Sequence, residues 1–161
     1  MIDRLAEFIA DHPGLVVLTG AGCSAASGIP TYRDQQGTWR RSTPIQHQDF
    51  VRRPSSRQRY WARSFIGWPA VHKARPNAAH VALAELEQRG LAGLLVTQNV
   101  DGLHQKAGHR RVLELHGRLD EVICLSCRRI VPRSGVQARL AELNPHLTAA
   151  DVSWALTPDG D

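Results

Sequence analysis

The stretch that decides the fold is Leu15-Val16-Val17-Leu18-Thr19, followed at once by Gly20-Ala21-Gly22-Cys23-Ser24-Ala25. A short, continuous apolar run that breaks into glycines predicts a buried parallel strand that enters a tight turn. Glycines in such a turn let main-chain N–H groups approach a phosphate, and the order Gly-x-Gly-x-x-Ala fits the fingerprint of dinucleotide-binding folds. The stretch therefore predicts a nucleotide site at the carboxyl end of this strand.

The residues after the turn differ from those of an ordinary dehydrogenase. The dinucleotide fingerprint expects an acidic residue about 20 positions further on, at the end of a second strand. Here the segment 39–44 reads Trp-Arg-Arg-Ser-Thr-Pro, without an acid. Ser27-Gly28-Ile29-Pro30 ends any helix early, and the polar segment 31–38 that follows carries Tyr32 and Arg33. We therefore expect a lid-like loop after the phosphate turn, in place of a long helix.

Composition and charge exclude several classes of protein. The 161 residues are 42% hydrophobic and carry a net charge of +5, which fits one globular domain. No run of Arg or Lys with interleaved aromatics predicts a nucleic-acid-binding face. The first residues, Met1-Ile2-Asp3-Arg4-Leu5-Ala6-Glu7, contain no apolar stretch long enough for a signal peptide or a membrane span. We expect a cytoplasmic protein that binds neither a membrane nor a specific nucleic acid.

Helical spacing dominates the first half of the chain outside the glycine turn. Apolar spacing predicts helices over residues 2–10, 45–51, 55–68 and 77–90. The first of them is expected to lead into a central strand of an α/β sheet. The stretch 44–90 contains no strand-like pattern and is too long for an ordinary connection between strand and helix. We expect it to form a helical insertion in a second, smaller lobe, with Trp61, Phe65 and Trp68 in its core.

Polar residues follow two further predicted strands. Leu94-Leu95-Val96-Thr97 leads into Gln98-Asn99-Val100-Asp101, and Val112-Leu113-Glu114-Leu115 leads into His116. Open α/β sheets bind ligands just past the carboxyl ends of their strands, so we expect these two strand ends to converge on one crevice. His116 is the candidate general base, because imidazole titrates near neutral pH and this one has Asn99 and Asp101 as companions.

The other histidines lack such companions in the sequence. We expect His104, one turn beyond Asp101, to be a local helix partner. The remaining ones are expected on the surface or on helices: His12, His47, His72, His80, His109 and His146.

Cys124-Leu125-Ser126-Cys127 is a C-x-x-C knuckle, which supplies two thiolates of a tetrahedral zinc site. A redox pair is the competing interpretation, but it would normally begin a helix in a thioredoxin-like βαβ unit, which is not expected here. A Zn(Cys)4 site needs a second cysteine pair, and the sequence holds only one more cysteine, Cys23, which we interpret as a small buried side chain. A short helix is expected over 136–143.

Taken together, these motifs resemble the sirtuin family of NAD-dependent protein deacylases in order and spacing. The matching motifs are Gly20-Ala21-Gly22, Gly28-Ile29-Pro30-x-Tyr32-Arg33, Thr97-Gln98-Asn99-Val100-Asp101-Gly102-Leu103-His104, Leu115-His116-Gly117 and Cys124-x-x-Cys127. The resemblance implies an α/β fold with an incomplete, Rossmann-like parallel sheet and a smaller lobe made of helices and a zinc ribbon. It divides the single, partial catalytic domain 1–161 into a Rossmann-like part (1–43 and 91–118), a helical insertion (44–90) and the start of a zinc-binding module (119–161).

The resemblance also implies roles for individual residues. Gly20 to Ser24 would hold the NAD pyrophosphate, and Tyr32 and Arg33 would close over the nicotinamide ribose. Gln98, Asn99 and Asp101 would hold the ribose and the carboxamide, and His116 would take a proton from a ribose hydroxyl during transfer of the acyl group. The expected catalytic residues are His116, Asn99 and Asp101. The expected NAD-binding residues are Gly20, Ala21, Gly22, Ser24, Ala25, Ile29, Pro30, Thr31, Tyr32, Arg33, Trp39, Gln98, Asn99, Val100, Asp101 and His116. Cys124 and Cys127 would bind one structural Zn²⁺.

Within the family, the chain looks most similar to class II, which includes mitochondrial sirtuin-4-type proteins. This rests on Tyr32 and on the segments 44–47, 59–63 and 67–69. The expected partners are acyl-lysine proteins, and the expected products are free lysine, nicotinamide and 2′-O-acyl-ADP-ribose. Tyr60 and Arg63 resemble the pair with which class III sirtuins bind acidic acyl groups, and the competing interpretation is a packed tyrosine beside a solvated arginine. The preferred acyl group, including lipoyl and long-chain groups, stays open.

Sirtuins continue through a second cysteine pair and further Rossmann strands, so we expect this chain to be truncated at its C-terminus. Two alternatives to a deacylase follow, a module that binds NAD or ADP-ribose without turnover and a mono-ADP-ribosyltransferase. A zinc-binding nucleic-acid module would leave Asn99, Asp101 and His116 without a purpose.

Overall fold

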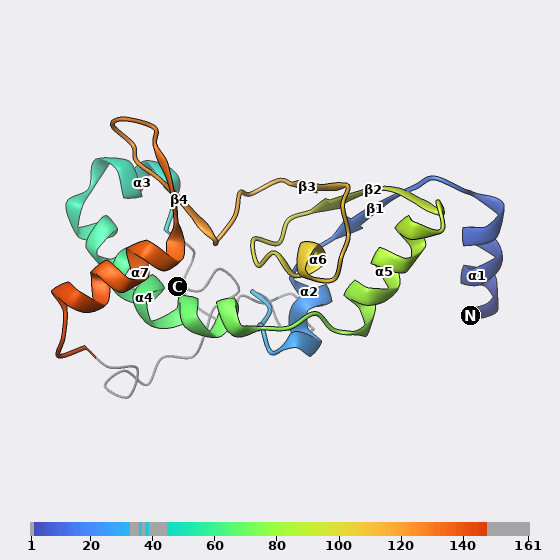
Figure 1. The fold of residues 1–161 in the computed structure, drawn as a ribbon, viewed down its shortest axis with the longest axis horizontal. Helices are drawn as coiled ribbons and strands as arrows, with labels where there is room; N and C mark the ends of the chain where they lie inside the picture. Colours follow the sequence, from blue (N-terminus) through green and yellow to red (C-terminus); the bar gives the residue numbers. More distant parts are fainter. Residues whose placement is uncertain (1, 33–35, 37, 39–44, 148–161) are drawn as a thin grey trace.

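The computed structural model describes residues 2–32, 36, 38 and 45–147. Two lobes lie side by side in Figure 1, one built on a parallel sheet and the other on helices and a small hairpin. The helix α4 (Pro54–Lys73) runs from the helical lobe toward the sheet lobe. The predicted α/β class with a second, smaller lobe is confirmed.

The sheet contains β1 (Leu15–Thr19), β2 (Ala92–Thr97) and β3 (Val112–Glu114) in the order β1-β2-β3. Both pairings are parallel, with Thr19 opposite Thr97 and Thr97 opposite Glu114. The expectation that the first strand is central is wrong for the described residues, because β2 lies in the middle and β1 at an edge. The carboxyl ends of all three strands reach the same edge of the sheet.

Among the described residues, helices cover one face of this sheet. The helices α2 (Ala21–Ser24), α5 (Ala78–Gln88) and α6 (Leu103–Lys106) lie on the same side in Figure 1. Side chains of β2 that face them are buried, such as Leu95 at 0% exposure. On the other face, Val16 and Leu18 are 67% and 66% exposed, so the prediction that the first strand is fully buried is wrong in the part of the chain described here.

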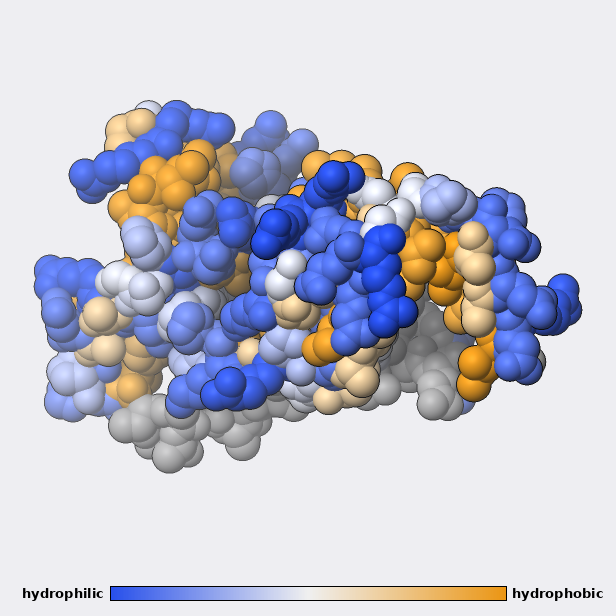
Figure 2. Space-filling view, turned by 45° about the vertical axis from the view of Figure 1, so that its right-hand side comes forward, coloured by the Kyte–Doolittle hydropathy of each residue, from blue (hydrophilic) through white to orange (hydrophobic). Residues whose placement is uncertain are grey.

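The helix α1 (Ile2–Asp11) precedes the sheet, as its apolar spacing predicts. Its apolar side chains do not pack into a core, since Ile2 and Leu5 are 82% and 59% exposed. Apolar residues also reach the surface in several patches in Figure 2. No helix in the described ranges is both long and apolar enough to cross a lipid bilayer.

The helical lobe contains the three helices predicted from spacing, with shifted bounds: α3 (His47–Arg52), α4 and α7 (Arg133–Leu143). It also contains two strands that were not predicted, β4 (Glu121–Ile123) and β5 (Ile130–Pro132). The strands β4 and β5 form an antiparallel hairpin. Trp68 is buried as expected, whereas Trp61 is half-buried. The guanidinium of Arg133 lies 4.8 Å from the ring of Trp68 and 5.5 Å from that of Trp61, so a cation–π stack ties α7 to α4.

One small core joins the lobes behind the strand ends. It contains Ile29 from the loop after the glycine turn, Val71 from α4 and Leu103 from α6, all at most 2% exposed. Hydrogen bonds extend this junction, because Trp68 Nε1 donates to the carbonyl oxygen of Leu119 over 3.0 Å and Leu119 N donates to that of Val100 over 3.0 Å. The glycine turn, α4 and the chain that leaves β3 are therefore held against one another.

Candidate active site

The glycine turn begins where β1 ends. Gly20 adopts an extended backbone conformation and caps α2, which lasts one turn before a 3₁₀ turn, Ala25–Ser27. Gly28 then takes φ = +83°, a conformation that side chains strongly disfavour, and this ends the helical stretch as predicted. At Gly22 an added Cβ would meet no atom within 4 Å. The backbone of the turn is thus open to a close-approaching group, as a phosphate cradle requires.

Ser24 links the turn to the end of β2. Its buried hydroxyl donates to Asp101 Oδ2 over 2.7 Å and accepts from Asn99 Nδ2 over 3.1 Å. Asn99 also donates to the carbonyl oxygen of Gly20 over 3.1 Å, and Asp101 Oδ1 accepts from the backbone N–H of Leu103 over 2.9 Å. These bonds leave the two polar residues after β2 fixed against the glycine turn.

His80 lies behind this network, on the predicted helix α5. It occupies the third helical position after the cap Asn77, whose backbone N–H donates to His80 Nδ1 over 3.3 Å. His80 Nε2 lies 3.5 Å from Ser24 Oγ, and burial is the main cause that lowers the pKa of His80, opposed by the charge of Asp101. Sequence reasoning missed this contact. The spacing of the capping box, Asn77 to His80, was the signal available.

His104 is fully buried and reaches across the fold. Its Nε2 lies 2.9 Å from Thr19 Oγ1, so it bonds to the end of β1 and the expectation of a local helix partner is wrong. Burial first, and then the neighbouring His80, lower the pKa of His104 to about 4. His109 is also buried, at 3% exposure, with Nδ1 3.3 Å from Glu87 Oε2. His104 is thus a neutral, packed side chain, and the expectation that His109 lies on the surface or on a helix is wrong.

His116 follows β3 at the same edge of the sheet and is exposed. Its Nδ1 lies 3.1 Å from the backbone carbonyl oxygen of Gln98. Because a carbonyl oxygen only accepts, Nδ1 donates in this contact, and the neutral tautomer that it selects has its lone pair on Nε2. The predicted convergence of the two strand ends is therefore realised through this contact, with a basic nitrogen left available.

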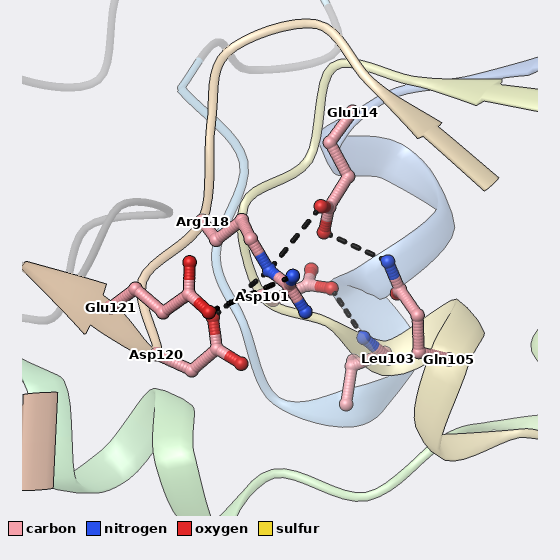
Figure 3. Close-up of polar contacts among 7 residues, drawn as sticks. All are labelled: Asp101, Leu103, Gln105, Glu114, Arg118, Asp120 and Glu121. Carbon is pink, nitrogen blue, oxygen red and sulfur yellow. Dashed lines mark hydrogen bonds and ion pairs between the residues drawn. The ribbon is translucent and has the colours of Figure 1, made fainter. Parts of the chain in front are cut away.

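Arg118 holds the segment that carries His116. Figure 3 shows its guanidinium between Glu114 at the end of β3 and Asp120 next to β4, with Nε 3.4 Å and 3.2 Å from their carboxylate oxygens. Gln105 Nε2 donates to Glu114 over 2.8 Å and ties α6 to the same cluster. Each exposed ion pair contributes little energy alone. Their shared effect is to fix the path of the chain on both sides of His116.

A cavity of about 20 Å³ opens between these elements. The residues that line it are Ala21, Ser24, Ile29, Tyr32, Gln98, Asn99, Val100 and Asp101. Every one of them belongs to the predicted NAD-binding set, although this volume holds only about one water. Ala25, Pro30 and Thr31 lie beside it in sequence but do not line it. Two other predicted residues, Arg33 and Trp39, lie outside the described residues.

Cys124 and Cys127 lie exposed in the turn between β4 and β5. Backbone N–H groups of Cys127 and Ser126 hydrogen-bond the sulfur of Cys124 and lower the pKa of its thiol. Arg128, at φ = 61°, closes the knuckle by donating its N–H to the carbonyl oxygen of Cys124. A lowered thiol pKa at Cys124 suits a Zn²⁺ ligand, and within the described residues no third ligand accompanies the two cysteines. Cys23 is half-buried, so the expectation of a buried side chain is only partly met, and it forms no disulfide bond with the other cysteines.

Replacing Ser24 by Ala tests the network directly. The change leaves Asp101 Oδ2 and Asn99 Nδ2 without their partner in a buried site, so we expect the free energy of unfolding to fall by about 1–3 kcal/mol. Urea denaturation followed by circular dichroism measures this. The matched Ser55→Ala variant, at an exposed position of α4, should unfold like the parent chain. Equal midpoints for both variants would contradict the network.

Comparison with known proteins agrees with this geometry. The family model described as "Sir2 family" matches residues 20–156. An "NAD-dependent protein deacetylase 2" from Bradyrhizobium diazoefficiens is 55% identical over 157 residues, 98% of this chain and 57% of that protein. An "NAD-dependent protein deacetylase" from Bordetella bronchiseptica is 55% identical over 160 residues, 99% of this chain and 58% of that protein.

Among solved structures, one described as Sir2 with a p53 peptide and NAD⁺ superposes with a TM-score of 0.74 at 34% identity, covering 87% of this chain and 55% of that one. The chain thus spans little more than half the length of these relatives. Because the family match extends from the glycine turn through the cysteine knuckle and beyond, the chain belongs to the Sir2 family, the sirtuins.

Proposed function

We propose that the protein carrying this chain is an NAD-dependent protein-lysine deacylase. One observation carries the proposal: His116 Nδ1 is bound to the carbonyl oxygen of Gln98, which leaves Nε2 as the outward nitrogen at the sheet edge where the open glycine turn and Asn99 meet. A neutral imidazole in this position is equipped to accept one proton. The relatives named as NAD-dependent protein deacetylases support the same reaction.

The residues present suit NAD. The open space over Gly22 admits a pyrophosphate to the N–H groups at the start of α2, where helix-end polarity favours an anion. Asn99 and Asp101, oriented by Ser24, would hold the ribose, and Tyr32 and Arg33 would cover it. When bound, NAD supplies an electrophilic ribose carbon and nicotinamide as the leaving group. His116 Nε2 would accept the proton of a ribose hydroxyl.

The metal and the partners belong to the same proposal. Cys124 and Cys127 would hold a structural Zn²⁺ together with ligands outside this pair. An acyl-lysine protein would be the substrate, in a cytoplasmic enzyme. Support comes from the solved relative that is described with a p53 peptide and NAD⁺. The N–H donors to Cys124 favour a metal-bound thiolate over a structural role for the free thiols.

Gly22→Ala separates phosphate binding from folding. Nothing lies within 4 Å of the new methyl group and φ is ordinary, so stability should hold or rise by up to about 1 kcal/mol, as for Gly to Ala in a helix. The affinity for NAD, measured by isothermal titration, should fall at least tenfold because the methyl group occupies the approach to the turn. Gly135→Ala in α7 also meets no atom within 4 Å, so it should give a similar small gain in stability and leave the NAD affinity unchanged. Unaltered NAD affinity in Gly22→Ala would refute the cradle.

His116→Ala tests the base. Loss of a general base should slow NAD-dependent removal of an acyl group from a lysine peptide by about 100-fold or more, with the dissociation constant for NAD little changed. Nicotinamide release and free peptide, followed by mass spectrometry, report the reaction. His146→Ala, at an exposed histidine after α7, serves as the control. A His116→Ala enzyme with the parent rate would exclude the assigned role.

We further propose that the enzyme belongs near class II, to which Tyr32 and the segments 44–47, 59–63 and 67–69 are similar. A separate proposal is that Tyr60 and Arg63 of α4, which resemble a class III pair, act on the acyl group. Support comes from Tyr60, which lines a cavity of about 370 Å³ between α4 and the β4–β5 hairpin. Exchanging Arg63 for Met should lower the rate for succinyl- and glutaryl-peptides by about tenfold relative to acetyl-peptide, as one lost charge-assisted contact implies. Unchanged relative rates would exclude a role in acyl selection.

A further inference from the structure

A second group of metal-ligating side chains lies directly behind the glycine turn. Cys23 from α2, His80 from α5 and His104 from α6 each offer one ligand atom, and these atoms all lie within 4.8 Å of one another. Cys23 is half-buried, whereas His80 and His104 are 0% and 1% exposed. The fold brings three distant parts of the chain together here, about 20 residues or more apart in sequence.

The protonation state of His104 leaves a buried lone pair without a partner. Thr19 donates its hydroxyl proton to Thr97 Oγ1 over 2.9 Å, so at the 2.9 Å contact with His104 it accepts from Nε2–H. His104 Nδ1 is then unprotonated, and it has no hydrogen-bond partner in the structure. A buried, unsatisfied acceptor is costly and calls for a ligand or a specific role. The ring centroid of His104 lies 4.7 Å from the ring centroid of His80.

The donor set is that of a borderline or soft cation. Cys23 Sγ lies 4.0 Å from His80 Nε2. In tetrahedral zinc sites the Zn–S and Zn–N bonds are about 2.3 and 2.0 Å, which places ligand atoms about 3.3–3.6 Å apart. The ligand atoms, which lie within 4.8 Å of one another, therefore need to approach by up to about 1.5 Å to meet one ion. Thiolate and imidazole ligands favour Zn²⁺ over Mg²⁺ or Ca²⁺, which prefer oxygen.

We propose that Cys23, His80 and His104 form a second metal site, distinct from the cysteine knuckle, which binds one Zn²⁺ ion and leaves a fourth position to solvent. On binding, the Cys23 thiol loses its proton to solvent. His80 moves its proton from Nε2 to Nδ1 and gives up the 3.3 Å bond from Asn77 N–H. His104 is already unprotonated at Nδ1. One proton is released for each ion bound, so the affinity rises with pH.

Metal binding changes the network that orients Asp101. The Nε2 atom of His80 that would bind the ion is the atom that now contacts Ser24 Oγ. A bound ion takes this contact away from the network formed by Ser24, Asn99 and Asp101, so metal and NAD should weaken each other's binding by the same factor. This coupling rests on the proposed function, whereas the metal site itself does not.

Cobalt titration of the full-length protein, with its knuckle already loaded with zinc, tests the site. We expect the parent protein to bind one Co²⁺ ion more than Cys23→Ser, with a sulfur-to-cobalt charge-transfer band in the near ultraviolet and release of one proton. His104→Gln keeps an N–H for Thr19 but removes the Nδ1 lone pair, and it should bind the ion at least tenfold more weakly. Equal cobalt uptake and an equal charge-transfer band in the parent and Cys23→Ser would overturn the proposal.

Alkylation gives a readout that needs no variant. One equivalent of Zn²⁺ beyond the knuckle should slow the reaction of Cys23 with iodoacetamide at least tenfold, as mapped by mass spectrometry. An unchanged rate would contradict metal binding at Cys23 even if a variant fails to fold. If the ion binds but the NAD affinity stays the same, the coupling is wrong and the metal site stands on the cobalt result.

Discussion

The hydroxyl of Ser24 is the point on which the site depends. It donates to Asp101 and accepts from Asn99, and so it joins the short helix after β1 to the turn after β2. Parallel strands deliver their polar ends to one edge of a sheet, but they do not by themselves orient the side chains found there. Buried hydrogen bonds do so here, because breaking any of them leaves a polar atom without water. The same hydrogen bonds fix the backbone on both sides of Gly22, because Asn99 binds the carbonyl oxygen of Gly20 and the hydroxyl of Ser24.

The position of His116 depends on the junction between the lobes. The chain leaves β3, passes through His116 and enters the hairpin of the helical lobe, and it is held on the way by Arg118 and by the backbone of Leu119. Trp68 of α4 fixes the same segment from the other side. A side chain placed in this crossing segment is positioned by both lobes, which suits the proposed transfer of an acyl group between them.

Much of the sheet lobe was predictable, because strong local signals specify it. The apolar run at 15–19 and the glycines after it predicted β1 and the turn, and Asn77 predicted the start of α5. The burial of His80 and His104 was not predictable, because the local sequence around a helical histidine is the same whether its side chain faces solvent or contacts a residue far along the chain. Here those contacts are Ser24 for His80 and Thr19 for His104. The same holds for the edge position of β1 and for the exposed Val16 and Leu18, which depend on which elements cover a face. The predicted helix 55–68 ended too early, because α4 continues through Pro69 to Lys73.

The most direct test of the account is a map of where NAD binds, obtained from amide chemical-shift changes in the ¹⁵N-labelled protein. The account predicts the largest changes at Gly20–Ser24, at Gln98–Asp101 and at His116, with small changes around the cavity between α4 and the β4–β5 hairpin. Changes confined to that cavity, or to the cysteine knuckle, would contradict the central claim that the Ser24 network builds the nucleotide site.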